Sequence, residues 1–258
     1  MSTGLKYNFI LWRMGYYHDQ NGILTRFYNE LNNWESHLMN TKSYILEFIK
    51  NSNPSNIAIL GSGWLLDVPL EDILITSRSL TLIDIVHPSK IRNKYKRNEG
   101  IKFVNADLTG GLIKQVYNIL FLNKKKNDLI LSKLQPQNFI DLNKFDLIIS
   151  VNILNQLDIL LIDKIMSRMN ISKEEINSLS ELIQTYHINS LPIGKSCLIT
   201  DFEELLFDKN GEQVKKNNLL FTKLPDGKNK KTWQWIFDTK QNYYKDYNVN
   251  YNVLALTF

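Results

Sequence analysis

Residues 57–63 read Ile-Ala-Ile-Leu-Gly-Ser-Gly, an apolar strand that runs directly into two glycines. A second apolar stretch, Leu80-Thr-Leu-Ile-Asp84, ends on an acid about twenty residues later. Glycine has no Cβ, so the backbone at Gly61 and Gly63 can come close to a bound ligand. An acid at the tip of the next strand can accept hydrogen bonds from ribose hydroxyls. This stretch therefore predicts a strand–turn–helix unit that binds a nucleotide.

Apolar strands and helical segments alternate along most of the chain. The predicted strands of this repeat are 57–60, 80–85, 101–105, 145–151 and 195–201. Strands that are separated by helices form parallel sheets. The last two strand-like segments, 232–238 and 248–258, have no helix between them and should pair as an antiparallel hairpin at one sheet edge. We therefore expect an α/β, Rossmann-like, doubly wound fold with a mostly parallel seven-stranded sheet and a C-terminal β-hairpin.

The segment before this repeat has a different pattern. Residues 5–22 are rich in aromatic side chains and are predicted to be irregular. From Phe27 to Phe48, apolar residues keep the three- and four-residue spacing of an amphipathic helix. Asn51-Ser-Asn-Pro54 then signals a loop. We predict an N-terminal helical cap or lid over residues 1–53 and a ligand-binding domain over 54–258.

Two helices are predicted between the fourth and fifth strands. They occupy about residues 153–168 and 173–187. The second is opened by Ser172-Lys-Glu-Glu175, a capping box in which the two side chains satisfy backbone N–H groups reciprocally.

The composition is that of a soluble globular protein, with 43% hydrophobic and 22% charged residues. No apolar run reaches the roughly 18 residues of a membrane span, and the N-terminus has no signal-peptide pattern. The single cysteine, Cys197, lies in a predicted buried strand and can form neither an internal disulfide nor a cysteine-rich metal site. We expect a cytoplasmic protein with no metal and no membrane association.

The net charge of +5 comes largely from three lysine runs in asparagine-rich stretches. These are Lys124–Lys126, Lys215–Lys216, and Lys228 with Lys230–Lys231. Solvated loops are the favoured interpretation. A nucleic-acid surface is the alternative, although no recognition helix or stacking motif accompanies the lysines.

The order of these elements resembles the class I S-adenosylmethionine-dependent methyltransferase fold over residues 55–258. Leu60-Gly-Ser-Gly63 resembles the glycine loop of that family, and Asp84 its ribose-binding acid. Asn105-Ala-Asp107 resembles the third-strand acid that contacts the adenine amino group, and Phe145–Ser150 the strand beside the methyl-transfer site. The resemblance implies S-adenosyl-L-methionine as the cofactor. It implies that the cofactor-binding residues are Gly61, Ser62, Gly63, Asp84, Ile85, Asp107, Leu108 and Ser150.

The sequence departs from the family pattern at three places. Leu65 stands at the third glycine position, and Ala58-Ile59 stands where an acid is common in the first strand. The Asn/Asp-Pro-Pro-Tyr/Phe signature of amino-nucleophile enzymes is replaced by Ser150-Val-Asn-Ile-Leu-Asn-Gln156. The methionine end of the cofactor is therefore expected to be held differently, or the protein binds the cofactor without turning it over.

Residues after the fourth strand and in the N-terminal cap are candidates for binding the methyl acceptor. Asn152, Asn155 and Gln156 follow the fourth strand and can orient a substrate by hydrogen bonds, with helix capping as the alternative role. Tyr17 and His18 can close over a substrate from the cap, with aromatic packing as the alternative. We predict these five residues to be substrate-binding.

A nitrogen or oxygen acceptor often needs a base to remove its proton. His87 and Glu203 are the candidates for catalysis, although His87-Pro88 also has the pattern of a helix entry. Asp201, Glu203 and Glu204 follow the fifth strand, and one of them could act as base or bind a cationic substrate, with solvated acids as the alternative. His37 is predicted to lie on a helix surface.

The favoured function is methyl transfer to a small molecule. An RNA or protein methyltransferase is an alternative because of the lysine runs. A catalytically silent cofactor-binding or partner-binding protein is another, because Leu65 alters the glycine loop. An NAD-dependent oxidoreductase would explain Gly61, Gly63 and Asp84, but not the terminal hairpin. The sequence specifies neither the acceptor nor the oligomeric state.

Overall fold

A computed structural model describes residues 3–50, 52–122, 133–137 and 140–258. The chain begins with three successive helices, α1 (Thr3–Met14), α2 (Tyr16–Asn29) and α3 (Leu31–Lys50). Residues 5–22 are therefore helical, and the expectation of an irregular segment is wrong. Gly15 separates α1 from α2 with a left-handed φ of 100°. This break shifts the helical phase, so the aromatic residues on its two sides do not follow one continuous periodicity.

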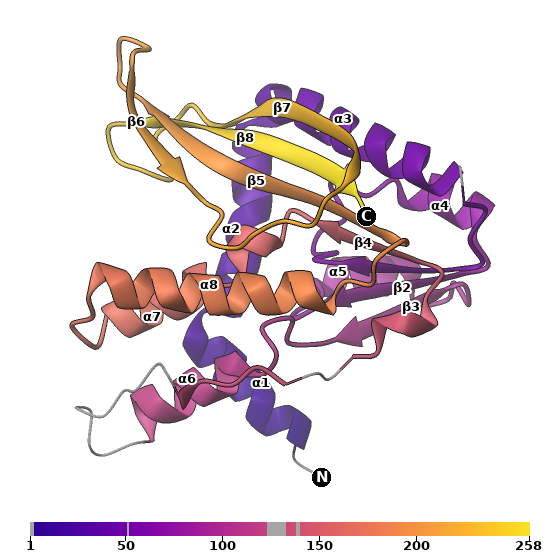
Figure 1. Cartoon of the computed structure of the whole chain (residues 1–258), viewed down its shortest axis with the longest axis horizontal. Coiled ribbons are helices and arrows are strands. Elements are labelled where there is room, and N and C mark those ends of the chain that lie inside the picture. Colours follow the sequence, from indigo (N-terminus) through magenta and orange to yellow (C-terminus); the bar gives the residue numbers. More distant parts are fainter. Residues whose placement is uncertain (1–2, 51, 123–132, 138–139) are drawn as a thin grey trace.

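Among the described residues, one sheet of eight strands forms the centre of the molecule (Figure 1). Its strands are β1 (Asn56–Leu60), β2 (Ser79–Asp84), β3 (Ile101–Asn105), β4 (Leu147–Val151), β5 (Ser196–Phe207), β6 (Gln213–Asn218), β7 (Lys228–Asp238) and β8 (Asn248–Thr257). They are arranged in the order β3-β2-β1-β4-β5-β8-β7, with β1 to β5 parallel. Strand β8 pairs antiparallel with both β5 and β7. The predicted mostly parallel, doubly wound sheet and its terminal hairpin are confirmed.

The additional strand is β6, which pairs antiparallel with the second half of β5. Its sequence, Gln-Val-Lys-Lys-Asn-Asn, has little apolar signal because the strand is almost entirely exposed. Lys215 and Lys216 therefore lie in a strand, and Lys228, Lys230 and Lys231 lie in β7, where loops were expected. The third lysine run, 124–126, falls outside the described residues.

The remaining helices connect the strands. They are α4 (Leu70–Thr76), α5 (Ser89–Tyr95), α6 (Leu112–Phe121), α7 (Ile159–Met166) and α8 (Lys173–Ser190), with short 3-10 segments η3 (Leu142–Lys144) and η4 (Leu154–Gln156). The helix predicted over 153–168 is thus divided into η4 and α7. The capping box of α8 is confirmed, since Ser172 Oγ accepts from Glu175 N at 3.2 Å and Glu175 Oε2 accepts from Ser172 N at 2.9 Å.

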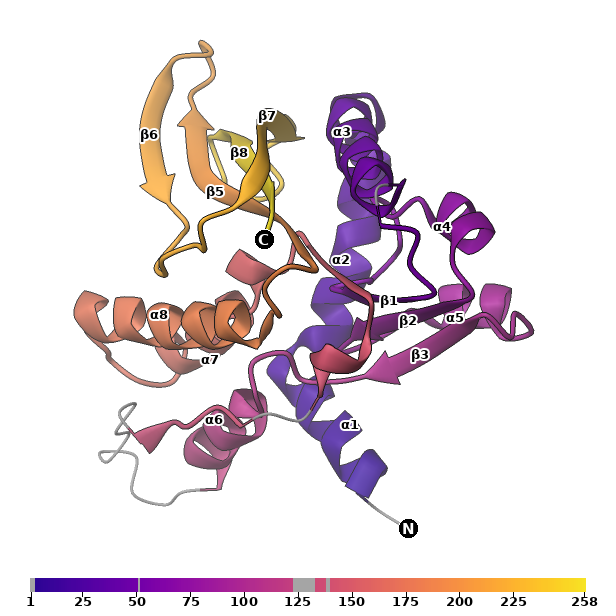
Figure 2. The ribbon, with the colours of Figure 1, turned by 45° about the vertical axis from the view of Figure 1, so that its right-hand side comes forward.

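Alternate side chains of the buried strands enter different apolar clusters. Ile57 and Ile59 of β1 pack in one cluster with residues of α3, including Ile45. Ala58 and Leu60 pack in another with Ile188 of α8. Helices α1, α2 and α3 follow one another along one side of the molecule, from α6 at one end to β7 at the other (Figure 2). This course brings the N-terminal segment to the carboxyl ends of the parallel strands.

Candidate ligand-binding site

Two adjoining pockets lie at the carboxyl ends of the parallel strands, the usual place for ligands in open α/β sheets. The glycine-loop pocket follows β1, β2 and β3, and its lining includes Asp84 and Asp107. The aromatic pocket extends from the same loop toward β5, β7 and β8, and its lining includes Trp235. Gly61 and Asn152 belong to both linings, so the two pockets form a continuous site.

The glycine loop after β1 is tightly constrained. A Cβ on Gly61 would lie 2.7 Å from Ile153 Cβ and 2.9 Å from Val151 O, and φ is +78°. Both the space and the backbone conformation therefore require glycine at Gly61. Leu65, at the departing third position, has a φ of 59°, which leucine adopts at a cost of about 1–2 kcal/mol. The loop therefore has a left-handed backbone conformation at Leu65, which glycine would adopt without this cost.

Asp84 holds this loop in place. Its Oδ2 accepts a hydrogen bond from Gly63 N at 2.7 Å, and its Oδ1 lies 3.4 Å from Val86 N. Burial raises the pKa of Asp84 to about 6, against the opposing effect of these backbone donors. The carboxylate thus orients the turn and also lines the glycine-loop pocket.

Asp107, just after the end of β3, likewise both accepts hydrogen bonds from the protein and lines the glycine-loop pocket. Its Oδ1 accepts from Thr109 N at 2.9 Å and from Thr109 Oγ1 at 2.5 Å. Its Oδ2 accepts from Tyr7 OH at 3.2 Å, which ties α1 to the site. Burial raises the pKa of Asp107. Ile85 and Leu108 line the same pocket.

Helix α2 lines both pockets with one face. The residues concerned keep helical spacing and are Tyr16, Asp19, Gln20, Ile23 and Arg26. Gln20 Nε2 donates to Val86 O at 3.0 Å, and Trp64 Nε1 donates to Gln20 O at 2.6 Å. These two bonds fasten α2 across the glycine loop.

The predicted contacts from Tyr17 and His18 are not found at this site. Neither residue belongs to the lining of the two pockets. Tyr17 packs against the apolar cluster that includes Val116 of α6, and His18 is exposed. Because the segment is helical, the neighbouring Tyr16, Asp19 and Gln20 face the pockets instead.

The aromatic pocket is built from segments that are far apart in the sequence. Its rings come from α3, from the glycine loop, from β7 and β8, and from the connection between β7 and β8. They are Trp34, His37, Trp64, Trp235, Phe237, Tyr243 and Tyr251. Trp34 stacks on Phe237 with ring centroids 5.6 Å apart. The Arg26 guanidinium lies over Phe237 at 5.3 Å and over Tyr243 at 5.4 Å. Aromatic residues alternate along β7 at Trp233, Trp235 and Phe237, and this is the sequence pattern that could have indicated an aromatic lining.

His37 lies inside the molecule, and the prediction of a surface position is wrong. It is 1% exposed and stacks on Trp235 with centroids 3.9 Å apart. Trp233 Nε1 donates to its Nδ1 at 3.1 Å. Burial lowers the pKa of His37 to about 3, so the ring is neutral. Its helix position, three residues after the buried Trp34, explains why it faces the core.

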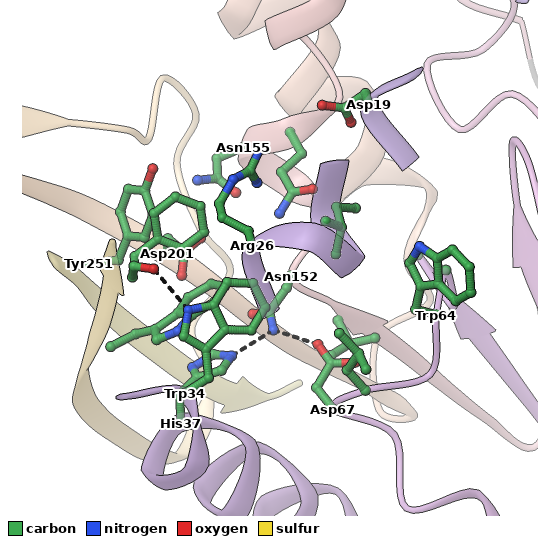
Figure 3. Close-up of a pocket in the computed structure, with 18 of the residues that line it drawn as sticks. Asp19, Arg26, Trp34, His37, Trp64, Asp67, Asn152, Asn155, Asp201 and Tyr251 are labelled. Carbon is green, nitrogen blue, oxygen red and sulfur yellow. Dashed lines mark hydrogen bonds between the residues drawn. The ribbon is translucent and has the colours of Figure 1, made fainter. Parts of the chain in front are cut away.

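The amides after β4 line the pockets, and Figure 3 shows Asn152 between His37 and Asp67. Asn152 Nδ2 donates to Asp67 Oδ2 at 2.7 Å and lies 3.1 Å from His37 Nε2. Asn155 and Gln156 belong to the lining of the aromatic pocket. The three predicted substrate-side amides are therefore brought together at one site.

Asp201, at the carboxyl end of β5, also faces the aromatic pocket. It is 2% exposed, so it is not a solvated acid. Burial raises the pKa of Asp201 to about 7, a hydrogen bond from Asn155 opposes this shift, and the Asp67 charge adds to it. Within the described residues, Asp201 Oδ1 and Asn155 Oδ1 have no hydrogen-bond partner.

The two serine candidates, Ser62 and Ser150, lie in different surroundings. Ser150 Oγ lies 2.8 Å from His187 Nε2 and belongs to neither pocket, because consecutive residues of β4 face opposite sides and Val151 faces the site. The cofactor contact predicted for Ser150 is therefore wrong. Ser62, by contrast, lines the aromatic pocket, is 1% exposed and has a hydroxyl without a hydrogen-bond partner in the described chain.

Neither candidate base belongs to the lining of either pocket. His87 Nε2 lies 3.1 Å from Val104 O, and its ring meets Phe103 edge-on with centroids 5.1 Å apart. Glu203 follows an irregularity in β5 and pairs with Lys216 at 2.5 Å. We therefore retain neither as a candidate base. Asp201, two positions before Glu203, is the acid of this segment that enters the pocket.

The described residues contain neither a metal-binding cluster nor a membrane-spanning helix. No cluster of three or more histidine, cysteine, aspartate or glutamate side chains has a metal-binding arrangement there. No helix in the same residues has both the length and the apolar character needed to cross a bilayer.

The chain matches no protein-family model and no curated protein. Among solved structures it is similar to the N-methyltransferase NodS from Bradyrhizobium japonicum WM9 bound to S-adenosyl-L-homocysteine, at 12% identity and a TM-score of 0.37 over 85% of this chain and 84% of that one. It is also similar to the 1,6-didemethyltoxoflavin-N1-methyltransferase of Burkholderia thailandensis, at 10% identity and a TM-score of 0.39 over 100% and 92% of the two chains. A complex of DhpI with SAH gives 8% identity and 0.36 over 96% and 97%. At these values the similarities identify no function.

Proposed function

We propose that this protein is an S-adenosylmethionine-dependent methyltransferase that acts on a small molecule, with residues 1–53 serving as a lid. The observation that carries the proposal is the link between Gly63 N and the Asp84 carboxylate at the carboxyl edge of the sheet. The strand order and the antiparallel hairpin resemble the class I methyltransferase fold and support the same assignment.

The residues of the glycine-loop pocket fit an adenosine group. Glycine at Gly61 lets the loop pack directly against Val151 and Ile153 at the edge of this pocket. We assign Asp84 to accept from ribose hydroxyls and Asp107 to accept from the adenine amino group, which their positions in the pocket lining support. Ile85 and Leu108 supply apolar surface for the purine. The unpartnered Ser62 hydroxyl is a candidate for holding the methionine end, where the common first-strand acid is missing.

When bound, the cofactor supplies an activated methyl group on a sulfonium. The protein then has to bind and orient an acceptor and exclude water from it. The aromatic pocket suits this task because its rings surround Asn152 and Asn155, whose amides can orient a small polar group. Its cavity of about 250 Å³ favours a small molecule over a polymer.

The described lysine runs give little support to an RNA acceptor. Lys216 pairs with Glu203 at 2.5 Å, and Lys231 pairs with Glu47 at 2.6 Å. Strands β6 and β7 carry these lysines, and none of them lines the two pockets.

Isothermal titration of S-adenosylhomocysteine into wild type and Asp84→Asn tests the proposal. Asparagine can still accept from Gly63 N, but it lacks the charge that strengthens hydrogen bonds to ribose. We expect binding to wild type and an affinity at least about tenfold lower for Asp84→Asn, since a bond to a charged group contributes about 1.5–3 kcal/mol. Glu203→Gln, a carboxylate change outside both pockets, is the control and should bind normally. Equal affinity of all three proteins would refute the assigned role of Asp84.

A further inference from the structure

The lining of the aromatic pocket contains more acidic than basic side chains. Its described lining contains four carboxylates, Asp19, Asp67, Asp163 and Asp201, and one guanidinium, Arg26. Arg26 already lies over Phe237 and Tyr243. Burial raises the pKa of Asp19, and the charge of Arg26 opposes this shift. The pocket therefore attracts positive charge more strongly than negative charge.

The deepest of these acids has unsatisfied acceptor capacity. Asp201 is 2% exposed and Asn155 is 7% exposed, yet Oδ1 of each has no hydrogen-bond partner among the described residues. A buried acceptor without a partner destabilises the ligand-free protein, because it has lost its hydrogen bonds to water. Both side chains line the same cavity, so a ligand that brings N–H donors would remove this cost. A ligand that presents only acceptors would not.

The surrounding rings suit the rest of such a ligand. Trp34, Trp235, Phe237 and Tyr251 line the cavity that Asp201 enters (Figure 3). Aromatic faces attract ammonium groups and also cover an apolar body. The neutral His37, stacked on Trp235, adds no competing positive charge.

We propose that the aromatic pocket binds an amine carried on a compact apolar or aromatic body, with Asp201 accepting its N–H groups and then its proton. In that step an N–H bond of the ammonium breaks, its electron pair stays on nitrogen, and the proton forms an O–H bond on the Asp201 carboxylate. The amine is the methyl acceptor, so this inference rests on the proposed methyltransferase function. It goes beyond that function by naming the acceptor class and the proton-accepting residue.

Binding measurements test this inference without turnover. Phenethylamine, tryptamine and cyclohexylamine are titrated into the protein saturated with S-adenosylhomocysteine, and binding is followed by tryptophan fluorescence and calorimetry. 2-Phenylethanol, tryptophol and cyclohexanol are the neutral counterparts. We expect at least one amine to bind about tenfold more tightly than its alcohol, and Asp201→Asn to remove this preference. Asp163→Asn, which removes an acid at the exposed rim of the same pocket, should keep most of it.

Three results would overturn the inference. The amines could bind no more tightly than the alcohols, or Asp163→Asn could reduce the preference as much as Asp201→Asn. Asp201→Asn could also weaken S-adenosylhomocysteine itself, which would assign this carboxylate to the ammonium group of the cofactor. Failure of S-adenosylhomocysteine to bind wild type would refute the proposed function separately, because the amine titration can be repeated with the ligand-free protein.

Discussion

At Gly61, the backbone conformation and the packing against Val151 and Ile153 both require glycine. Gly61→Ala introduces a Cβ at 2.7 Å from Ile153 Cβ and imposes a φ of +78° on alanine. Gly194→Ala is a matched control, because Gly194 has a φ of +87° but nothing within 4 Å of its Cβ position. We expect urea unfolding to show a loss of about 1 kcal/mol for Gly194→Ala and at least about 2 kcal/mol more for Gly61→Ala. Equal losses would mean that the loop relaxes around the new methyl group.

Asp201 should destabilise the ligand-free protein at high pH. Burial raises its pKa to about 7 from 3.8, so the folded state binds the proton more tightly than the unfolded state does. The stability from this group is complete below about pH 4 and is lost as the pH rises through 7. We expect Asp201→Asn to be more stable than wild type at pH 8, by at least about 1–2 kcal/mol, and to be of similar stability near pH 4. Thermal unfolding without ligand checks this, and a variant less stable than wild type at pH 8 would contradict it.

The residues of the glycine loop and the acid that holds it could be predicted because their sequence motifs directly follow the ends of strands. Gly61, Gly63 and Asp84 follow strand ends, and the structure brings them together. Asp201 could not be distinguished from Glu203 in the same way. Strand β5 continues past the predicted end and has an irregular register between these two residues, and this local geometry decides which acid enters the pocket.

Among the elements, α2 lines both pockets and is hydrogen-bonded across the glycine loop. Gln20 Nε2 bonds Val86 O, and its side chain lies 3.4 Å from the position of a Cβ on Gly63. Gln20→Ala removes this bond and should let S-adenosylhomocysteine associate and dissociate several-fold faster, since a hydrogen bond contributes about 1 kcal/mol. Stopped-flow tryptophan fluorescence measures both rates. Thr25→Ala, on the exposed side of α2, is the control. Identical rates in the two variants would show that the Gln20 bond of α2 does not limit ligand entry and release.

Elements were predictable where they are buried. Strands β1, β2 and β4 are predominantly apolar and almost completely buried, and the capping box marks the start of α8. Strand β6 is polar and exposed, so its six residues have no such signal. The break at Gly15 concealed α1 and α2, and with them the face that lines the pockets.

At the scale of the whole molecule, the site consists of two pockets of different origin. One is formed by residues that follow neighbouring strands, and the other by segments that lie far apart in the sequence. The glycine-loop pocket depends on motifs within a few residues of the ends of β1 to β3. The aromatic pocket depends on α3 meeting β7, for example through Trp34 Nε1, which donates to Phe237 O at 2.8 Å across 203 positions of sequence. No periodicity in either segment encodes that meeting, which is why the sequence indicated a cofactor class but not an acceptor.

Parallel titrations of the wild-type protein with S-adenosylhomocysteine and with NAD test the central claim most directly. Both ligands contain adenosine, so the difference between them isolates the part of the site beyond Asp84 and Asp107. We predict that S-adenosylhomocysteine binds with one site per chain and that NAD binds at least about a hundredfold more weakly, a difference of about 2.7 kcal/mol. Binding of NAD without binding of S-adenosylhomocysteine would contradict the methyltransferase assignment.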